Sequence, residues 1–183
     1  MTEEVIKIKD LKGYYRGSFG VVHAVDGVSL SVNKGDIVAI AGESGCGKTT
    51  LAELITGRPI QLLHHEGGQV YVNDLSMYEL DAEVVRKEIL CKVMGYVPQA
   101  SQNSLNPVKK IRSFILDVTR ERTGRKPENT EQVLDRVAEH FNKLGLERSV
   151  LDKYPHELSG GMKQRVVVGI STLWNPLILI VDE

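Results

Sequence analysis

Apolar and polar residues alternate in two segments near the start of the chain. Residues 5–8 read VIKI and residues 28–32 read VSLSV. A period of two is typical of β-strands that bury one face and leave the other in solvent. We therefore predict two strands of an antiparallel sheet here, with loops marked by Gly13, Gly17 and Gly20.

A different pattern follows, because residues 37–41 are all apolar and read IVAIA. An uninterrupted apolar run of this length is typical of a strand that is buried on both faces. The run leads directly into a glycine-rich segment, and a helix is expected to begin near Thr50. The prediction for this region is a strand–loop–helix unit.

The middle of the chain alternates between predicted strands and helices. Strands are predicted at residues 70–72, which read VYV after a pair of glycines, and at residues 93–97. The charged stretch between them, from about 81 to 92, is predicted to be helical.

A longer helix is predicted after residue 127, where apolar residues recur at the spacing of one helical face. Gly145 is placed to end this helix. The chain finishes with residues 177–181, LILIV, a run of strand length that Asn175 and Pro176 introduce. The residues that share the apolar face of the helix are Val133, Leu134, Val137, Ala138, Phe141 and Leu144.

The composition is that of a globular domain with one core, since 42% of the 183 residues are hydrophobic. The formal net charge is -1, so the chain has no overall positive field to attract nucleic acid or an anionic membrane surface. Nucleic acid is therefore not an expected partner, and any recognition of phosphate must be local.

The sequence predicts neither a membrane-spanning segment nor a secretory signal. Its most apolar stretch, residues 166–181, is short for a membrane span and contains Asn175 and Pro176. The N-terminal residues, MTEEVIKIKD, are acidic where a secretory signal carries positive charge. Cys46 and Cys91 lack the spacing of a metal site, so both are expected to be free thiols in a reducing cytosol.

Residues 42–49 read GESGCGKT and match the phosphate-binding pattern GxxxxGK(S/T) in full. Glycines let the backbone wrap around phosphate, so that N–H groups and the next helix N-terminus point at the anion. Lys48 is expected to reach the β- and γ-phosphates of ATP, and the Thr49 hydroxyl to ligate Mg²⁺. The flanking strand and helix disfavour the alternative of a plain surface turn. The residues expected to contact the nucleotide here are Gly42, Ser44, Gly45, Cys46, Gly47, Lys48, Thr49 and Thr50.

Two carboxylates, Asp182 and Glu183, follow the last apolar run. Open α/β sheets bind ligands at the carboxyl ends of their strands. We expect Asp182 to hold the metal through water and Glu183 to polarise the water that attacks the γ-phosphate. An apolar strand that ends in Asp-Glu is weak support by itself, and the complete phosphate loop strengthens it.

Residues 158–165 read LSGGMKQR. Ser159 is expected to cap a helix. Because Gly160 and Gly161 have no side chains, the first N–H groups of this helix are expected to be accessible and able to bind a phosphate. Without a phosphate loop in the same chain, this segment would be interpreted as an ordinary capped helix. Together with that loop, it resembles the signature sequence of ATP-binding-cassette (ABC) ATPases.

The resemblance to ABC ATPases implies roles for further residues. Gln99 corresponds to the glutamine that senses Mg²⁺ and the attacking water, and Tyr15 to the aromatic residue that stacks on adenine, with Tyr14 as the alternative. The resemblance therefore implies Lys48, Gln99 and Glu183 as catalytic residues. It implies Thr49, Gln99 and Asp182 as metal-binding residues.

Three further segments resemble the ATPases of dipeptide, oligopeptide and nickel importers. They are residues 24–29 (AVDGVS), 104–107 (SLNP) and 154–157 (YPHE). The chain departs from that subgroup at residues 100–101, where an acidic residue and proline are usual. Gly169 lies inside the expected signature helix, where glycine costs about 1 kcal/mol relative to alanine.

The resemblance implies an α/β P-loop NTPase core with an N-terminal antiparallel β subdomain and an inserted helical subdomain. The expected division is an antiparallel β and nucleotide-binding core at 1–105, a helical subdomain at 106–174, and the strand with the carboxylates at 175–183. ABC ATPases continue beyond this point with a partner-contact loop and a switch histidine. The chain is therefore expected to be a C-terminally incomplete cassette that turns ATP over poorly by itself.

The function implied is an ATP-hydrolysing subunit that energises import of di- or oligopeptides, with ATP and Mg²⁺ as cofactors. The alternatives are another solute such as nickel, or a fragment that binds nucleotide without hydrolysis. The implied partners are a second ABC ATPase subunit, transmembrane permease subunits and, indirectly, an extracytoplasmic solute-binding protein. The implied location is the cytoplasmic face of the cell membrane. A DNA-repair ATPase is disfavoured, because no heptad-repeat arm fits between Thr49 and Leu158.

Overall fold

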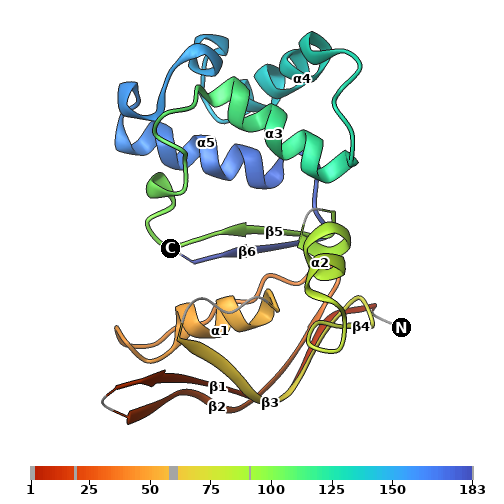
Figure 1. The fold of residues 1–183 in the computed structure, drawn as a ribbon, viewed down its shortest axis with the longest axis vertical. Helices are drawn as coiled ribbons and strands as arrows, with labels where there is room; N and C mark the ends of the chain where they lie inside the picture. The colour runs from red at the N-terminus through yellow and green to blue at the C-terminus, as the bar shows by residue number, and fades with distance from the viewer. Residues whose placement is uncertain (1–2, 19, 58–61, 91, 183) are drawn as a thin grey trace. The chain divides into compact units, whose positions relative to one another are not determined.

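The computed structural model describes the whole chain except residues 1–2, 19, 58–61, 91 and 183. The described residues fall into two compact units (Figure 1). The first unit contains the described residues of 1–90 together with Asp182, and the second contains those of 91–181.

The first unit contains an antiparallel sheet with the strand order β2-β1-β3-β4. Its strands cover the segments in which alternation predicted strands at 5–8, 28–32 and 70–72, so those predictions are confirmed. The strand bounds are β1 (Glu4–Gly17), β2 (Gly20–Asn33), β3 (Leu63–Val72) and β4 (Leu75–Ser76).

The loop predicted at Gly13 is wrong, because Gly13 lies inside β1. Helix α1 (Lys48–Ile55) packs on this sheet, and a Cβ added at Gly13 would lie 2.3 Å from Cδ1 of Leu54. The glycine therefore allows a close approach between strand and helix. An isolated glycine within a strand often marks such a contact rather than a loop. Gly17 and Gly20 do flank the turn between β1 and β2.

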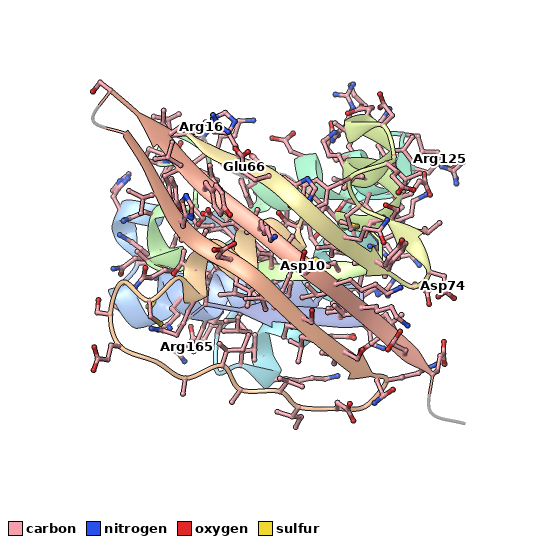
Figure 2. All side chains as sticks on the ribbon, turned by 90° about the horizontal axis from the view of Figure 1, so that it is seen from below. Asp10, Arg16, Glu66, Asp74, Arg125 and Arg165 are labelled. Atoms are coloured by element: carbon pink, nitrogen blue, oxygen red, sulfur yellow. The ribbon has the colours of Figure 1, made fainter. Side chains whose placement is uncertain are left out.

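An ion pair links the two central strands of this sheet. Figure 2 shows the side chains of Arg16 on β1 and Glu66 on β3 pointing toward one another. Nε and Nη2 of Arg16 donate to the two carboxylate oxygens of Glu66 at 2.7 and 2.8 Å. This bidentate geometry lowers the pKa of Glu66 below its ordinary value.

The helical stretch predicted from about 81 to 92 is confirmed as a short helix, α2 (Ala82–Val84), followed by a π-helical turn, η1 (Val85–Leu90). The Asp81 side chain caps the start by accepting a hydrogen bond from the N–H of Glu83 at 2.8 Å.

The strand predicted at residues 37–41 is wrong. Residues 36–43 have no regular secondary structure, and the side chains of Ile37, Val38 and Ile40 are exposed, that of Ile37 fully. A strand requires hydrogen bonds to a neighbouring strand as well as apolar residues. Within the part of the chain that the structure describes, no strand pairs with this segment.

The second unit contains a pair of parallel strands and three longer helices (Figure 1). The strands predicted at 93–97 and 177–181 are confirmed as β5 (Met94–Val97) and β6 (Ile178–Val181), which pair in parallel. The helices are α3 (Ile111–Thr123), α4 (Thr130–Lys143) and α5 (Gly160–Thr172). The short 3-10 turns are η2 (Ser101–Asn103), η3 (Arg148–Asp152) and η4 (Pro155–Glu157).

Helix α4 is the helix predicted after residue 127. Asn129 caps its start by accepting from the N–H of Gln132 at 3.0 Å, and Gly145, with φ of 69°, follows its end. Arg165 on α5 donates through Nη1 to the carbonyls of Leu144 and Gly145 at 3.2 and 3.1 Å. The guanidinium therefore satisfies carbonyls that the end of the helix leaves open. Leu134, Val137 and Phe141 are buried, as the periodicity predicted.

Gly169 brings α5 close to α4. A Cβ added at Gly169 would lie 2.7 Å from Cε1 of Phe141 and 3.1 Å from Cδ1 of Leu144. Phe141 is fully buried in the core of this unit, so its ring has no space into which it can move. The glycine that is unfavourable for the isolated helix is therefore required by packing. Among the described residues, no helix is both long and apolar enough to cross a bilayer.

We expect Gly169→Ala to destabilise the second unit by about 1–3 kcal/mol, because overpacking outweighs the gain in helix propensity. Urea unfolding followed by the fluorescence of Trp174, the single tryptophan, measures this change, since Trp174 packs against the same core. The control is Gly161→Ala on the same helix, where an added Cβ meets nothing within 4 Å. A Gly169→Ala variant as stable as its control would contradict the packing role.

Candidate nucleotide-binding site

The phosphate loop has a backbone that favours glycine at two positions. Gly45 and Gly47 have φ of 82° and 100°, in the left-handed region. At Gly47 the surroundings add a second restriction, because a Cβ there would lie 2.4 Å from the carbonyl oxygen of Ala24. Gly45 has open space around it. Gly47 therefore determines both the turn into α1 and how closely the loop approaches β2.

Helix α1 begins directly after this loop without a side-chain cap. Its N-cap residue is Gly47, and its first turn contains no acidic residue. The first N–H groups of a helix have no partner within the helix, and the positive end of the helix dipole lies there. The start of α1 is therefore suited to bind an anion such as phosphate.

The Lys48 ammonium lies against the loop itself. Its Nζ donates to the carbonyl oxygens of Gly42 and Glu43 at 2.8 and 2.7 Å, and lies 3.7 Å from Sγ of Cys46. Both carbonyl acceptors are neutral, and among the described residues no carboxylate forms an ion pair with Lys48. Its charge is therefore available to an anion bound by the loop.

Thr49 and Asp182, far apart in the sequence, meet within the first unit. Oγ1 of Thr49 donates to Oδ1 of Asp182 at 3.2 Å. Asp182 is only 9% exposed, and its Oδ2 is buried without a hydrogen-bond partner. A buried carboxylate oxygen without a partner is costly, and hydroxyl and carboxylate oxygens are the donors that Mg²⁺ prefers. The residues present therefore fit a magnesium ion.

Glu53 is an acidic residue of this site that the sequence analysis missed. It follows Thr49 by four positions on α1, and its Oε2 is also buried without a hydrogen-bond partner. Burial raises the pKa of Glu53 above its ordinary value, and the negative charge of Asp182 raises it further. The i, i+4 spacing from Thr49 was the signal available in the sequence.

The two candidate tyrosines for adenine have different surroundings. The hydroxyl of Tyr15 lies 3.3 Å from Oγ1 of Thr50, which is buried in α1. The ring of Tyr14 is stacked on that of His23 at 3.9 Å between centroids, and its hydroxyl donates to Asp26. Tyr15 therefore contacts the helix of the phosphate loop, whereas one face of Tyr14 is already covered.

Two of the expected site segments belong to the second unit. Ser159 caps α5 by accepting from the N–H of Met162 at 3.3 Å, so the predicted cap is confirmed. An added Cβ at Gly161 would meet nothing within 4 Å, and one at Gly160 would lie 3.1 Å from Oε1 of Gln102. Gln99 follows β5 and precedes Ala100, which has a left-handed backbone with φ of 52°.

Glu183, the expected base, lies outside the described residues, so its role stays a prediction. Among the described residues, no group of three or more His, Cys, Asp or Glu residues could hold a metal by itself. A metal ion held by Asp182 would therefore need further oxygens, which the hydroxyl of Thr49 and a bound phosphate could supply.

Residues 25–183 match the ABC transporter family, and the chain belongs to that family. The dipeptide transport ATP-binding protein DppD of Caldanaerobacter subterraneus is 35% identical over 180 residues, covering 98% of this chain and 54% of that protein. The oligopeptide transport ATP-binding protein AppF of Bacillus subtilis is 34% identical over 194 aligned positions, covering 99% and 55%. The chain thus spans about half the length of these curated relatives.

Solved structures agree on the fold. The dimeric bacterial ABC transporter cassette MJ0796 has a TM-score of 0.85 at 27% identity, covering 97% of this chain and 73% of that chain. The same cassette in a post-hydrolysis state, bound to ADP and Pi, has a TM-score of 0.84 at 26% identity. The α/β fold of an ABC ATPase, expected from the sequence, is confirmed.

We expect Gly47→Ala to weaken binding of a fluorescent ATP analogue by about tenfold or more. Strain at a left-handed residue is about 1–3 kcal/mol, and each 1.4 kcal/mol corresponds to about tenfold in affinity. The matched control is Gly45→Ala, which has a similar φ but no backbone collision, so its loss should be smaller. Equal affinities for the two variants would show that the contact with Ala24 does not position the loop.

Proposed function

We propose that this chain is the nucleotide-binding part of an ATPase that energises an ABC importer. The observation that carries the proposal is the contact between Thr49 and Asp182 beside the uncapped start of α1. It places oxygens suited to Mg²⁺ next to a site suited to phosphate, within one compact unit. ATP bound with Mg²⁺ is the ligand that has both groups.

Each residue near the phosphates has a distinct role in this proposal. The loop backbone and the start of α1 bind the β- and γ-phosphates, and Lys48 adds a positive charge to them. Thr49 and Asp182 would hold Mg²⁺, Asp182 through water. When bound, Mg²⁺ neutralises charge on the phosphate oxygens. Gln99 and Glu183 orient and polarise the attacking water, by their correspondence to the family's motif residues.

We assign the adenine contact to Tyr15. Its hydroxyl contact with Thr50 holds the ring beside the helix that follows the phosphate loop. The ring of Tyr14 is already stacked on His23, so only the other face of the Tyr14 ring is left for adenine.

The capped start of α5 is proposed to bind a nucleotide held by a second cassette. Ser159, Gly160 and Gly161 leave the first N–H groups of α5 open toward solvent, since all three residues are exposed. The solved cassette similar to this chain forms a dimer. The proposal is therefore a pair of cassettes, each presenting its phosphate loop to the other's Ser-Gly-Gly segment.

The transported substrate is proposed to be a di- or oligopeptide, because relatives similar over nearly the whole chain are named for dipeptide and oligopeptide transport. The remaining partners are permease subunits and, indirectly, an extracytoplasmic solute-binding protein. The protein then works on the cytoplasmic face of the membrane. By resemblance to the family, the permease is proposed to contact the segment from about residue 100 to 111, which follows Gln99 and leads into α3.

In a protein that carries the complete cassette, Lys48→Ala should reduce Mg-ATP hydrolysis by about a hundredfold or more, because a phosphate-binding cation is lost. Phosphate release measures the rate. Lys34→Ala is the control, since Lys34 is an exposed lysine that forms an ion pair with Glu3. Near-normal hydrolysis by Lys48→Ala would refute the site, and an inactive wild-type cassette that still binds ATP would favour the non-hydrolysing alternative.

A further inference from the structure

Two carboxylates in the first unit have a buried oxygen without a hydrogen-bond partner. These oxygens are Oε2 of Glu53 and Oδ2 of Asp182. No other described residue has a buried side-chain nitrogen or oxygen atom in this condition. Buried polar atoms are nearly always paired with protein, water or an ion, so two unpaired atoms in one unit point to a missing partner.

Both carboxylates are related to Thr49, Glu53 by its spacing along α1 and Asp182 by a hydrogen bond. Glu53 follows Thr49 by one helical turn, and helical side chains lean toward the N-terminus of their helix, so Glu53 leans toward Thr49. Thr49 in turn donates to Asp182 at 3.2 Å. Burial raises the pKa of Glu53, and the negative charge of Asp182 raises it further.

Like charges in a partly buried site are unfavourable unless a cation or a set of hydrogen bonds compensates them. Within the part of the chain that the structure describes, neither carboxylate forms an ion pair with a lysine, arginine or histidine. A divalent cation with a water shell satisfies both unpaired oxygens at once, since Mg²⁺ and Mn²⁺ accept carboxylate, hydroxyl and water oxygens.

We propose that Glu53, Asp182 and Thr49 form a divalent-cation site that binds Mg²⁺ or Mn²⁺ before nucleotide arrives. The inference rests on the proposed metal site at Thr49 and Asp182 and adds Glu53 to it. Glu53 is a positioning residue that holds the cation through its water shell. In this arrangement the cation is already next to the start of α1 when the phosphates enter.

The test is Mn²⁺ binding to the 183-residue chain without nucleotide, measured from the free Mn²⁺ signal in electron paramagnetic resonance. Loss of an outer-shell partner typically weakens metal binding by about 10–100-fold. We expect at least tenfold weaker binding for Glu53→Gln and for Asp182→Asn. The matched control is Glu79→Gln, which removes the same charge from an exposed residue of the same unit and should leave the affinity unchanged.

A thermal-unfolding measurement separates the cation role from a structural one. Without metal, Glu53→Gln should raise the melting temperature, because it removes the repulsion with Asp182. The same variant should show a smaller increase in melting temperature on addition of Mg²⁺, because ligand-linked stabilisation depends on affinity. A lower melting temperature with an unchanged response to Mg²⁺ would assign Glu53 a structural role and overturn the proposal.

The remaining outcomes distinguish this inference from the proposed function. If Asp182→Asn weakens Mn²⁺ binding and Glu53→Gln does not, the role of Glu53 is refuted while the metal site stands. If the wild-type chain binds no Mn²⁺ at millimolar concentration without nucleotide, the inference is refuted. A further Mn²⁺ titration with ATP present then tests the metal site at Thr49 and Asp182 alone. If Asp182→Asn does not weaken Mn²⁺ binding in that titration, the proposed function is refuted as well.

Discussion

The hydrogen bond between Thr49 and Asp182 joins residues that are 133 positions apart, and the arrangement of the site depends on it. A carboxylate as buried as Asp182 needs partners for both oxygens, and the protein supplies one of them through Thr49. Thr49 occupies this position because it lies in the first turn of α1. The start of α1 therefore determines where the acidic group and the phosphate loop meet.

The starts of α1, α4 and α5 differ in how their first N–H groups are satisfied. In the second unit, Asn129 and Ser159 cap α4 and α5 with side-chain oxygens. In the first unit, α1 starts after Gly47 without a side-chain cap, and its N–H groups are left for a ligand. A helix start without a side-chain cap is less stable than a capped one. In α1 this loss of stability coincides with a glycine loop and with Lys48, whose charge is not paired with a carboxylate among the described residues. The cost to stability at the start of α1 thus falls at the place where the proposed function requires an anion site.

Close contacts set by the absence of a side chain recur in both units. The absence of a Cβ at Gly13 allows Leu54 to pack against β1. In the same way Gly47 allows close contact with the carbonyl of Ala24, and Gly169 allows Phe141 to pack against α5. Only Gly47 belongs to a recognisable motif. Helix propensity alone predicts that glycine at position 169 is less stable than alanine. The packing requires glycine there, because protein interiors have little free volume to take up an extra methyl group.

The sequence by itself determined the features that depend on neighbouring residues. Alternation predicted β1, β2 and β3, periodicity predicted α4, and two short motifs predicted the phosphate loop and the Ser159 cap, because these depend on local backbone and side-chain geometry. Contacts between distant residues were decided by the tertiary structure alone. The apolar run at 37–41 forms no strand, because strand formation depends on a partner that the run itself does not specify. Glu53 has the pattern of an ordinary helical glutamate, and its spacing from Thr49 was visible in the sequence. Only the hydrogen bond between Thr49 and Asp182, residues 133 positions apart, brings a second carboxylate to this site.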